Sequence, residues 1–124
     1  MGWFSKKESD ELAWEKVSSV GQIDSLIEMS NEVPILFFKH STRCGVSSMA
    51  LNRLSTNWKL TPEECKLAFV DILAFRDVSN YLAENLAVSH QSPQVILIKN
   101  KEVIYHSSHS GISALDIVSA LKKN

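Results

Sequence analysis

The continuous apolar run at 35–38 constrains the fold more than any other feature of this chain. A run without polar alternation is typical of a strand that is buried on both faces, as in a parallel or mixed sheet. Further strands are predicted at 14–17, 67–72, 95–99 and 103–106, and the helical spacing of apolar residues predicts helices at 22–31, 46–58, 78–86 and 113–122. Strand and helix therefore alternate over most of the chain.

The order of these predicted elements is β-α-β-α-β-α-β-β-α. Strands that alternate with helices are joined by crossovers and run parallel, whereas Asn100 and Lys101 are a tight-turn signal that predicts an antiparallel final pair. Ser113 is the predicted N-cap of the last helix. The result is an α/β domain with a central mixed sheet flanked by helices, which is the element order of a thioredoxin-like fold.

The composition limits the class of protein and its partners. The chain has 124 residues, 44% hydrophobic and 22% charged, which fits a single domain at 12–124 after a polar N-terminal arm at 1–11. Its formal net charge of −1 gives no electrostatic reason to expect nucleic acid or a membrane surface as a partner. The N-terminus lacks the apolar segment of a secretory signal, so we expect a cytoplasmic protein.

One cysteine lies at the predicted junction between the first long strand and the following helix. Cys44 is followed three residues later by Ser47, at the position where a dithiol oxidoreductase carries its second cysteine. The free N–H groups and the positive end of the helix dipole favour a thiolate here, and Arg43, Lys39 and His40 are expected to add positive charge. Ser47 is expected to donate a hydrogen bond to the sulfur. Because Ser47 cannot resolve a mixed disulfide, a second thiol must come from another molecule.

A proline supplies the second element of the predicted site. Pro93 follows Ser92 and stands immediately before the strand at 95–99. Considered alone, this proline is an ordinary strand-start residue, and Cys44 alone could be a buried and inert thiol. In thioredoxin folds a cis proline at this point faces the nucleophile, so the two residues together are a more specific signal than either one.

The other cysteine is predicted to be structural. Cys65 precedes the strand at 67–72, which should run parallel to the strand that leads to Cys44. It then lies at the opposite end of the sheet, beyond the distance that a disulfide bond spans.

The histidines do not predict a metal site. Of the four, only His106 and His109 approach zinc-ligand spacing, and they do so loosely. His109 and Ser110 join the last strand to the last helix, and in thioredoxin folds this junction borders the nucleophile. We therefore expect His109 or Ser110 to contact a small thiol ligand.

Taken together, these segments resemble one known family. The chain is similar to the YtxJ-like bacillithiol-system family, the monothiol bacilliredoxins, in the stretches 39–44, 92–95 and 106–110 and at Ser47. The resemblance covers most of the chain from residue 33 onward. It departs from the family pattern at Gly45 and Val46, where Pro-Ile is frequent.

The resemblance implies a thiol–disulfide oxidoreductase that removes bacillithiol, or a similar low-molecular-weight thiol, from protein mixed disulfides. Its partners would be S-thiolated proteins and the small thiol, with bacillithiol as co-substrate and no bound cofactor. Charge alone suggests Lys39, Arg43 and Arg76 for the malate carboxylates of bacillithiol. The expected catalytic residues are Cys44 and Ser47, and the expected substrate-binding residues are Thr42, Arg43, Ser92, Pro93, His109 and Ser110.

Two other functions stay open on the sequence. The stretch 44–47 also looks like the Cys-Gly-Phe-Ser of monothiol glutaredoxins, which carry glutathione-bound iron–sulfur clusters. Their Thr-Val-Pro is replaced here by Gln91-Ser92-Pro93, and their Gly-Gly pair is absent. A non-catalytic thioredoxin-like interaction module is the other alternative. A general thioredoxin is disfavoured because its buried aspartate, six residues before the nucleophile, is Phe38 here.

Overall fold

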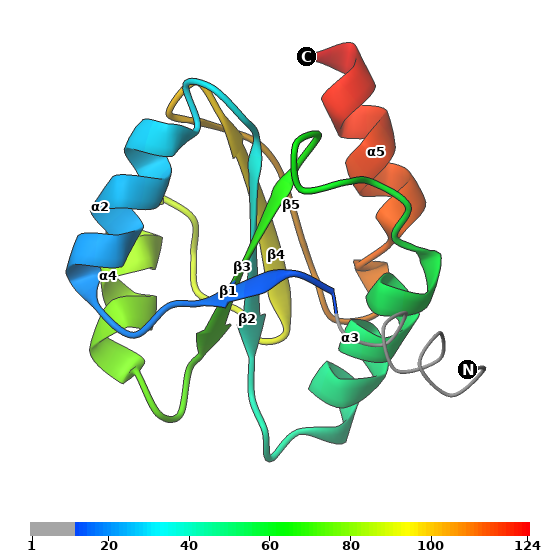
Figure 1. Cartoon of the computed structure of the whole chain (residues 1–124). Coiled ribbons are helices and arrows are strands. Elements are labelled where there is room, and N and C mark those ends of the chain that lie inside the picture. The colour runs from blue at the N-terminus through cyan, green and yellow to red at the C-terminus, as the bar shows by residue number, and fades with distance from the viewer. Residues whose placement is uncertain (1–11) are drawn as a thin grey trace, which may run out of the picture.

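The computed structural model describes residues 12–124, and the predicted polar arm at 1–11 lies outside the described residues. The strands are β1 (Trp14–Lys16), β2 (Ile35–His40), β3 (Lys66–Asp71), β4 (Gln94–Lys99) and β5 (Glu102–Ser108), and the helices are α2 (Val20–Met29), α3 (Gly45–Asn57), α4 (Arg76–Leu86), the 3₁₀ turn η1 (His109–Gly111) and α5 (Ala114–Lys123). The strands form one five-stranded sheet in the order β1-β3-β2-β4-β5 (Figure 1). The predicted succession of elements and the mixed central sheet are confirmed.

Strand β2 is the centre of the sheet. It pairs in parallel with β3 and antiparallel with β4, and all six of its residues are buried. The apolar run that predicted a doubly covered strand is the middle of β2.

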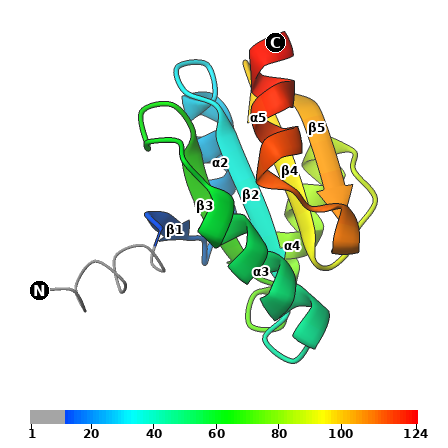
Figure 2. The same ribbon diagram turned by 90° about the vertical axis from the view of Figure 1, so that its right-hand side faces the viewer.

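The two faces of β2 belong to two separate cores. Leu36 and Phe38 pack with α3 and α5, whereas Ile35 and Phe37 pack with α2 and α4. In Figure 1 the helices α2 and α4 cover one side of the sheet, and Figure 2 shows α3 and α5 in front of the other. Alternation along the strand places Lys39 on the α2 and α4 side and His40 on the α3 and α5 side.

The helix boundaries differ from the predictions for identifiable reasons. Helix α2 begins at Val20 because the Ser19 hydroxyl accepts a hydrogen bond from the Gln22 N–H, so Ser19 is the N-cap. The predicted cap of α5 is confirmed, since Ser113 accepts from the Asp116 N–H. Helix α4 begins two residues before the predicted start, and the turn η1 was not predicted.

The inward stripe of α3 also differs from the prediction. Its buried residues are Ser47, Ala50 and Leu54, at spacings of three and four. Val46 and Met49, whose apolar side chains contribute to the helical spacing that predicts the helix at 46–58, are 51% and 67% exposed. The helix is therefore rotated so that Ser47 faces the sheet and two apolar side chains face outward.

Cys65 lies where the sequence placed it. Its neighbour Lys66 pairs with Ile35 at the start of β2, while Cys44 follows the end of that strand. Cys65 is fully buried, and burial raises the pKa of its thiol to about 12. It is a protonated, structural thiol at the far end of the sheet, and neither cysteine is in a disulfide.

Within residues 12–124 no helix is both long enough and apolar enough to cross a bilayer.

We predict that Lys39→Met changes the pH dependence of stability. Burial lowers the pKa of Lys39 from its ordinary 10.5 to about 8, so between these pH values the unfolded chain binds more protons than the folded one. Because of Lys39, the free energy of unfolding of the wild type should therefore rise with pH between these two values. The variant should lack that contribution and be more stable at pH 7, by about 1–3 kcal/mol.

Urea unfolding from pH 7 to 10.5 measures both effects. Lys16→Met, at an exposed position, is the matched control and should run parallel to the wild type. A Lys39→Met curve that is also parallel to the wild type would contradict the prediction.

Candidate active site

Cys44 is the N-cap residue of α3 and is half-buried. Its N–H donates to the Ser41 carbonyl at 3.1 Å, and its own carbonyl accepts from the Ser48 N–H at 3.2 Å. The backbone is extended at Cys44, and its side chain makes no capping hydrogen bond. Cys44 therefore directly precedes the first helical turn, whose N–H groups have no partner within the helix.

Ser47 contacts the strand rather than the sulfur. Its buried hydroxyl oxygen accepts from the Ser41 N–H at 3.1 Å and lies 2.6 Å from His40 Nδ1. Among the described residues no hydrogen bond joins Ser47 to Cys44. The expectation that Ser47 donates to the sulfur is therefore wrong, because the inward rotation of α3 turns its hydroxyl toward the end of β2.

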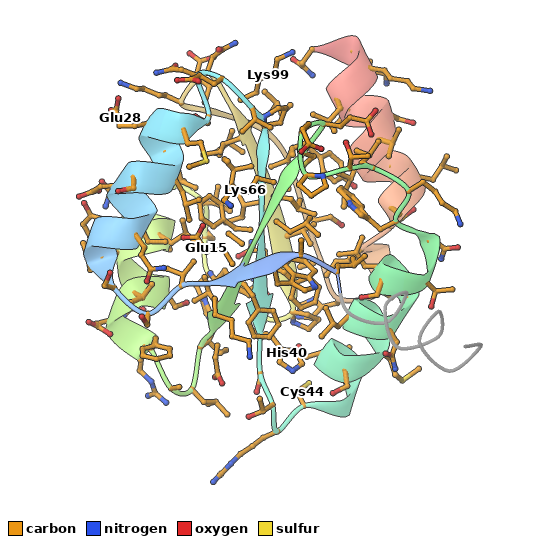
Figure 3. The ribbon with its side chains drawn as sticks, viewed as in Figure 1. Glu15, Glu28, His40, Cys44, Lys66 and Lys99 are labelled. Atoms are coloured by element: carbon orange, nitrogen blue, oxygen red, sulfur yellow. The ribbon has the colours of Figure 1, made fainter. Side chains whose placement is uncertain are left out.

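His40 is the titratable group closest to this serine. Burial lowers its pKa below the ordinary 6.5, and the nearby Asp71 carboxylate, on the adjacent strand, partly opposes that shift. His40 is therefore neutral at pH 7, and the Ser47 hydroxyl can donate its proton to Nδ1 while its oxygen accepts from Ser41. Figure 3 shows His40 and Cys44 at the same end of the sheet.

The positive charge expected around Cys44 is reduced to one side chain. His40 is neutral, and Lys39 faces the other side of the sheet, where its Nζ donates to Gln94 Oε1 at 3.0 Å. Arg43 is exposed next to the cysteine, as is Thr42. The expectation that Lys39 and His40 supply charge at the thiol is wrong, because Lys39 points to the other face of the sheet and His40, although on the side of α3, is kept neutral by burial.

The loop before β4 lies at the same end of the sheet as Cys44, because Gln94 at the start of β4 pairs with Lys39 near the end of β2. The Ser92–Pro93 peptide bond is cis, and the Pro93 carbonyl accepts from the His109 N–H at 3.0 Å. This hydrogen bond fixes the turn η1, with exposed His109 and Ser110, against the proline loop. The Ser92 hydroxyl is buried and has no hydrogen-bond partner among the described residues. The structure thus brings together Pro93, which precedes β4, and His109, which follows β5.

Arg53 is a site-supporting residue that the sequence did not identify. From α3 its guanidinium donates to the Ile112 carbonyl at 3.1 and 3.2 Å and to the His109 carbonyl at 3.5 Å. It therefore holds η1 and the start of α5 against α3. The available signal was an arginine within the predicted apolar stripe of this helix.

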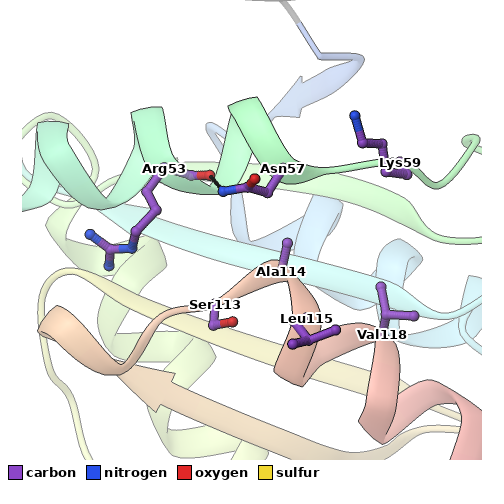
Figure 4. Close-up of a pocket in the computed structure, with 7 residues that line it drawn as sticks. All are labelled: Arg53, Asn57, Lys59, Ser113, Ala114, Leu115 and Val118. Carbon is purple, nitrogen blue, oxygen red and sulfur yellow. Dashed lines mark hydrogen bonds between the residues drawn. The ribbon is translucent and has the colours of Figure 1, made fainter.

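A pocket of about 370 Å³ beside Arg53 lies outside this site. It is formed between the second half of α3 and the first turns of α5, and Cys44 does not line it (Figure 4). Its lining residues are Arg53, Asn57, Lys59, Ser113, Ala114, Leu115 and Val118.

Strand β2, which leads to Cys44, carries the aromatic ring of Phe38 at the position where a thioredoxin has a buried aspartate. Phe38 stacks on Phe69 of β3 with ring centroids 6.3 Å apart, and His40 lies 5.3 Å from Phe69. In the part of the chain that the structure describes, no three His, Cys, Asp or Glu side chains are grouped so that they could hold a metal ion.

We predict that Ser47→Ala destabilises the protein by about 1–3 kcal/mol, because it leaves the part-buried Ser41 N–H and the buried His40 Nδ1 without their partner. Ser48→Ala, one residue along the same helix and exposed, should stay within about 0.5 kcal/mol of the wild type. Urea unfolding at pH 7 measures both. Equal effects of the two substitutions would show that the buried hydrogen bonds contribute nothing.

Solved structures with the thioredoxin fold match the chain. One, described as a candidate oxidoreductase with a thioredoxin fold, is 26% identical, covers 86% of this chain and 92% of its own, and has a TM-score of 0.75. Mitochondrial thioredoxin 3 from Saccharomyces cerevisiae is 15% identical over 94% of this chain and all of its own, with a TM-score of 0.68. Thioredoxin from Trypanosoma brucei brucei is 17% identical over 90% and 89%, with a TM-score of 0.63. The predicted thioredoxin-like fold is confirmed.

The family comparison is more specific than the fold. A family model described as monothiol bacilliredoxin BrxC matches residues 15–117, which include Cys44, Ser47 and Pro93. This match confirms the resemblance found in the sequence and supports a thiol–disulfide redox role. The chain belongs to the monothiol bacilliredoxin family, within the thioredoxin-like superfamily.

Proposed function

We propose that this protein is a thiol–disulfide oxidoreductase that removes bacillithiol from protein mixed disulfides through a Cys44 intermediate. The observation that carries the proposal is the separation of its two cysteines. Cys44 is partly exposed at a helix N-terminus, and Cys65 is fully buried at the other end of the sheet. With serine at position 47, the chain has no thiol of its own within reach to resolve an adduct on Cys44.

In the first step the Cys44 thiolate attacks the bacillithiol sulfur of the mixed disulfide. The disulfide bond of the substrate breaks, the protein cysteine leaves as a thiolate, and a Cys44–bacillithiol disulfide forms. In the second step an external thiolate attacks the bacillithiol sulfur of this adduct. The Cys44 thiolate is released, and the bacillithiol leaves as a disulfide with the external thiol. The two electrons that reduced the substrate therefore come from these two small thiols.

The surface around Cys44 suits a protein substrate. Val46 and Met49 expose apolar side chains on the first turns of α3, whereas Ala50 and Leu54 of the same helix are buried. Exposed apolar groups beside a reactive residue are typical of a protein contact surface. The small thiol would lie between this turn and the proline loop, near Thr42, Arg43, Ser92, Pro93, His109 and Ser110, in a cytoplasmic setting where thiols stay reduced.

We predict that incubation with oxidised bacillithiol adds one bacillithiol to the protein, at Cys44. Cys44→Ser should form no adduct, because the nucleophile is absent. The same variant should release bacillithiol from a thiolated protein at least about a hundredfold more slowly than the wild type. Cys65→Ser is the matched control and should react like the wild type. Intact-protein and peptide mass spectrometry measures the adduct.

A parallel incubation with oxidised glutathione tests whether bacillithiol or another small thiol is the co-substrate. The proposal fails if the adduct forms on Cys65, or if glutathione alone reacts. A brown protein with the absorption of an iron–sulfur cluster after anaerobic purification would favour the cluster-carrier alternative.

A further inference from the structure

The turn that carries Cys44 is tied to a buried side chain of the following helix. The Cys44 N–H donates to the Ser41 carbonyl at 3.1 Å, which closes the turn 41–44 between β2 and α3. The N–H of the same Ser41 donates to the Ser47 hydroxyl at 3.1 Å. The position of Cys44 is therefore linked to that of the Ser47 oxygen through a single residue.

Burial alone does not fix the direction of the Ser47 hydroxyl. The side chain is 0% exposed and belongs to the inward stripe of α3. A serine within a helix can rotate and donate to the carbonyl three or four residues earlier, which here belongs to Cys44 or Arg43. In that rotamer the Ser47 oxygen would no longer serve the Ser41 N–H.

His40 supplies a competing acceptor that keeps Ser47 in place. Its Nδ1 lies 2.6 Å from Ser47 Oγ, and its side chain is only 7% exposed. Because burial lowers the pKa of His40 below the ordinary 6.5, the ring is neutral at pH 7 and Nδ1 can accept the serine proton. A hydroxyl that donates to Nδ1 keeps its own lone pairs free for the Ser41 N–H.

The imidazole is itself held by aromatic neighbours. Its ring centroid lies 5.3 Å from that of Phe69 and 6.1 Å from that of Phe38, beside the end of β2 (Figure 3). Asp71 pairs with His40 across the two strands, but its Oδ1 accepts from two backbone N–H groups of the turn that follows β3. Within residues 12–124 the His40 ring therefore hydrogen-bonds to Ser47 and to no other side chain.

We propose that His40 is a positioning residue for Cys44 and that it acts through Ser47 and Ser41 to hold the turn that presents the thiol. The contacts run from the imidazole to the Ser47 hydroxyl, from this hydroxyl to the Ser41 N–H, and from the Ser41 carbonyl to the Cys44 N–H. Ser47 then affects the thiol through the backbone and not through a bond to the sulfur. The reaction of Cys44 with bacillithiol rests on the proposed function, whereas the hydrogen bonds and the reaction with other disulfides do not.

Two substitutions separate the hydrogen bond of His40 from the volume of its ring. Asparagine retains an acceptor oxygen close to the backbone, and leucine retains apolar bulk without an acceptor. His40→Leu should slow the reaction of the full chain with dithiodipyridine, an aromatic disulfide, by at least about tenfold, because a small displacement of a reacting atom has a large effect on rate. His40→Asn should restore most of the wild-type rate. Absorbance measures the rate, and peptide mass spectrometry assigns the adduct to Cys44.

Hydrogen exchange of the Ser41 amide, measured by NMR, reports on the turn directly. His40→Leu and Ser47→Ala should exchange this proton at least about tenfold faster than the wild type, the effect of losing one hydrogen bond. His40→Asn should keep the protection. A role of His40 in packing alone would not give this rescue by asparagine.

A double-mutant cycle tests whether His40 acts through Ser47. The variant with both His40→Leu and Ser47→Ala should react no more slowly than the slower single variant. Ile23→Val is the control, because it weakens the core on the opposite face of the sheet without touching the turn, and it should leave the rate unchanged. His40→Phe replaces His40→Leu if circular dichroism shows that the leucine variant does not fold.

Equal rates for the acceptor-free variant and His40→Asn, additive losses in the cycle, or unchanged exchange of the Ser41 amide would overturn the proposal. A parallel reaction with oxidised bacillithiol keeps it distinct from the proposed function. A wild type that forms no bacillithiol adduct, yet depends on His40 in its reaction with dithiodipyridine, would refute the proposed function alone. A bacillithiol adduct that forms equally fast in the wild type and the acceptor-free variant would refute the positioning role alone.

Discussion

The structure depends on the complete burial of strand β2. A strand covered on both faces has to pair on both edges, and β2 does so with β3 in parallel and β4 in the opposite direction. The parallel pair brings the ends of β2 and β3 together, and the antiparallel pair brings the start of β4 to the same place. Cys44, the start of α4 and the cis-proline loop meet at one end of the molecule for this reason. The thiol site is a consequence of how the central strand is paired.

Burial also explains why polar side chains at the end of β2 have such different roles. Lys39 and His40 are neighbours in sequence, yet one faces α4 and the other faces α3. Both side chains are kept from water, and each has one hydrogen-bonding side chain as its partner. Lys39 pairs with Gln94, and His40 pairs with Ser47. The charge of Lys39 is therefore directed away from Cys44, which lies at the N-terminus of α3 beside the exposed Arg43.

Most of the fold could be predicted because its signals are long and repeated. The apolar strands, the hairpin turn and the helical spacing each specify one element, and together they permit few topologies. The separation of Cys44 and Cys65 followed from the direction of two parallel strands. Side-chain partners were less predictable. The rotation of α3 depends on which of two overlapping stripes is buried, and Val46 and Met49 are as apolar as the residues that are buried. The partners of Ser47 and the carbonyl ligands of Arg53 follow from that rotation and from η1, so they were missed.

The isolation of Cys44 from any other thiol also determines how the protein withstands peroxide. A cysteine oxidised to sulfenic acid is protected when a nearby thiol condenses with it, and further oxidation to sulfinic acid is irreversible in most proteins. Here the only other cysteine of the chain is buried at the far end of the sheet. Rescue of the sulfenic acid by disulfide formation must therefore come from outside the chain. The supply of small thiols around the protein would then set both the rate at which Cys44 is recycled and the dose of oxidant that it survives.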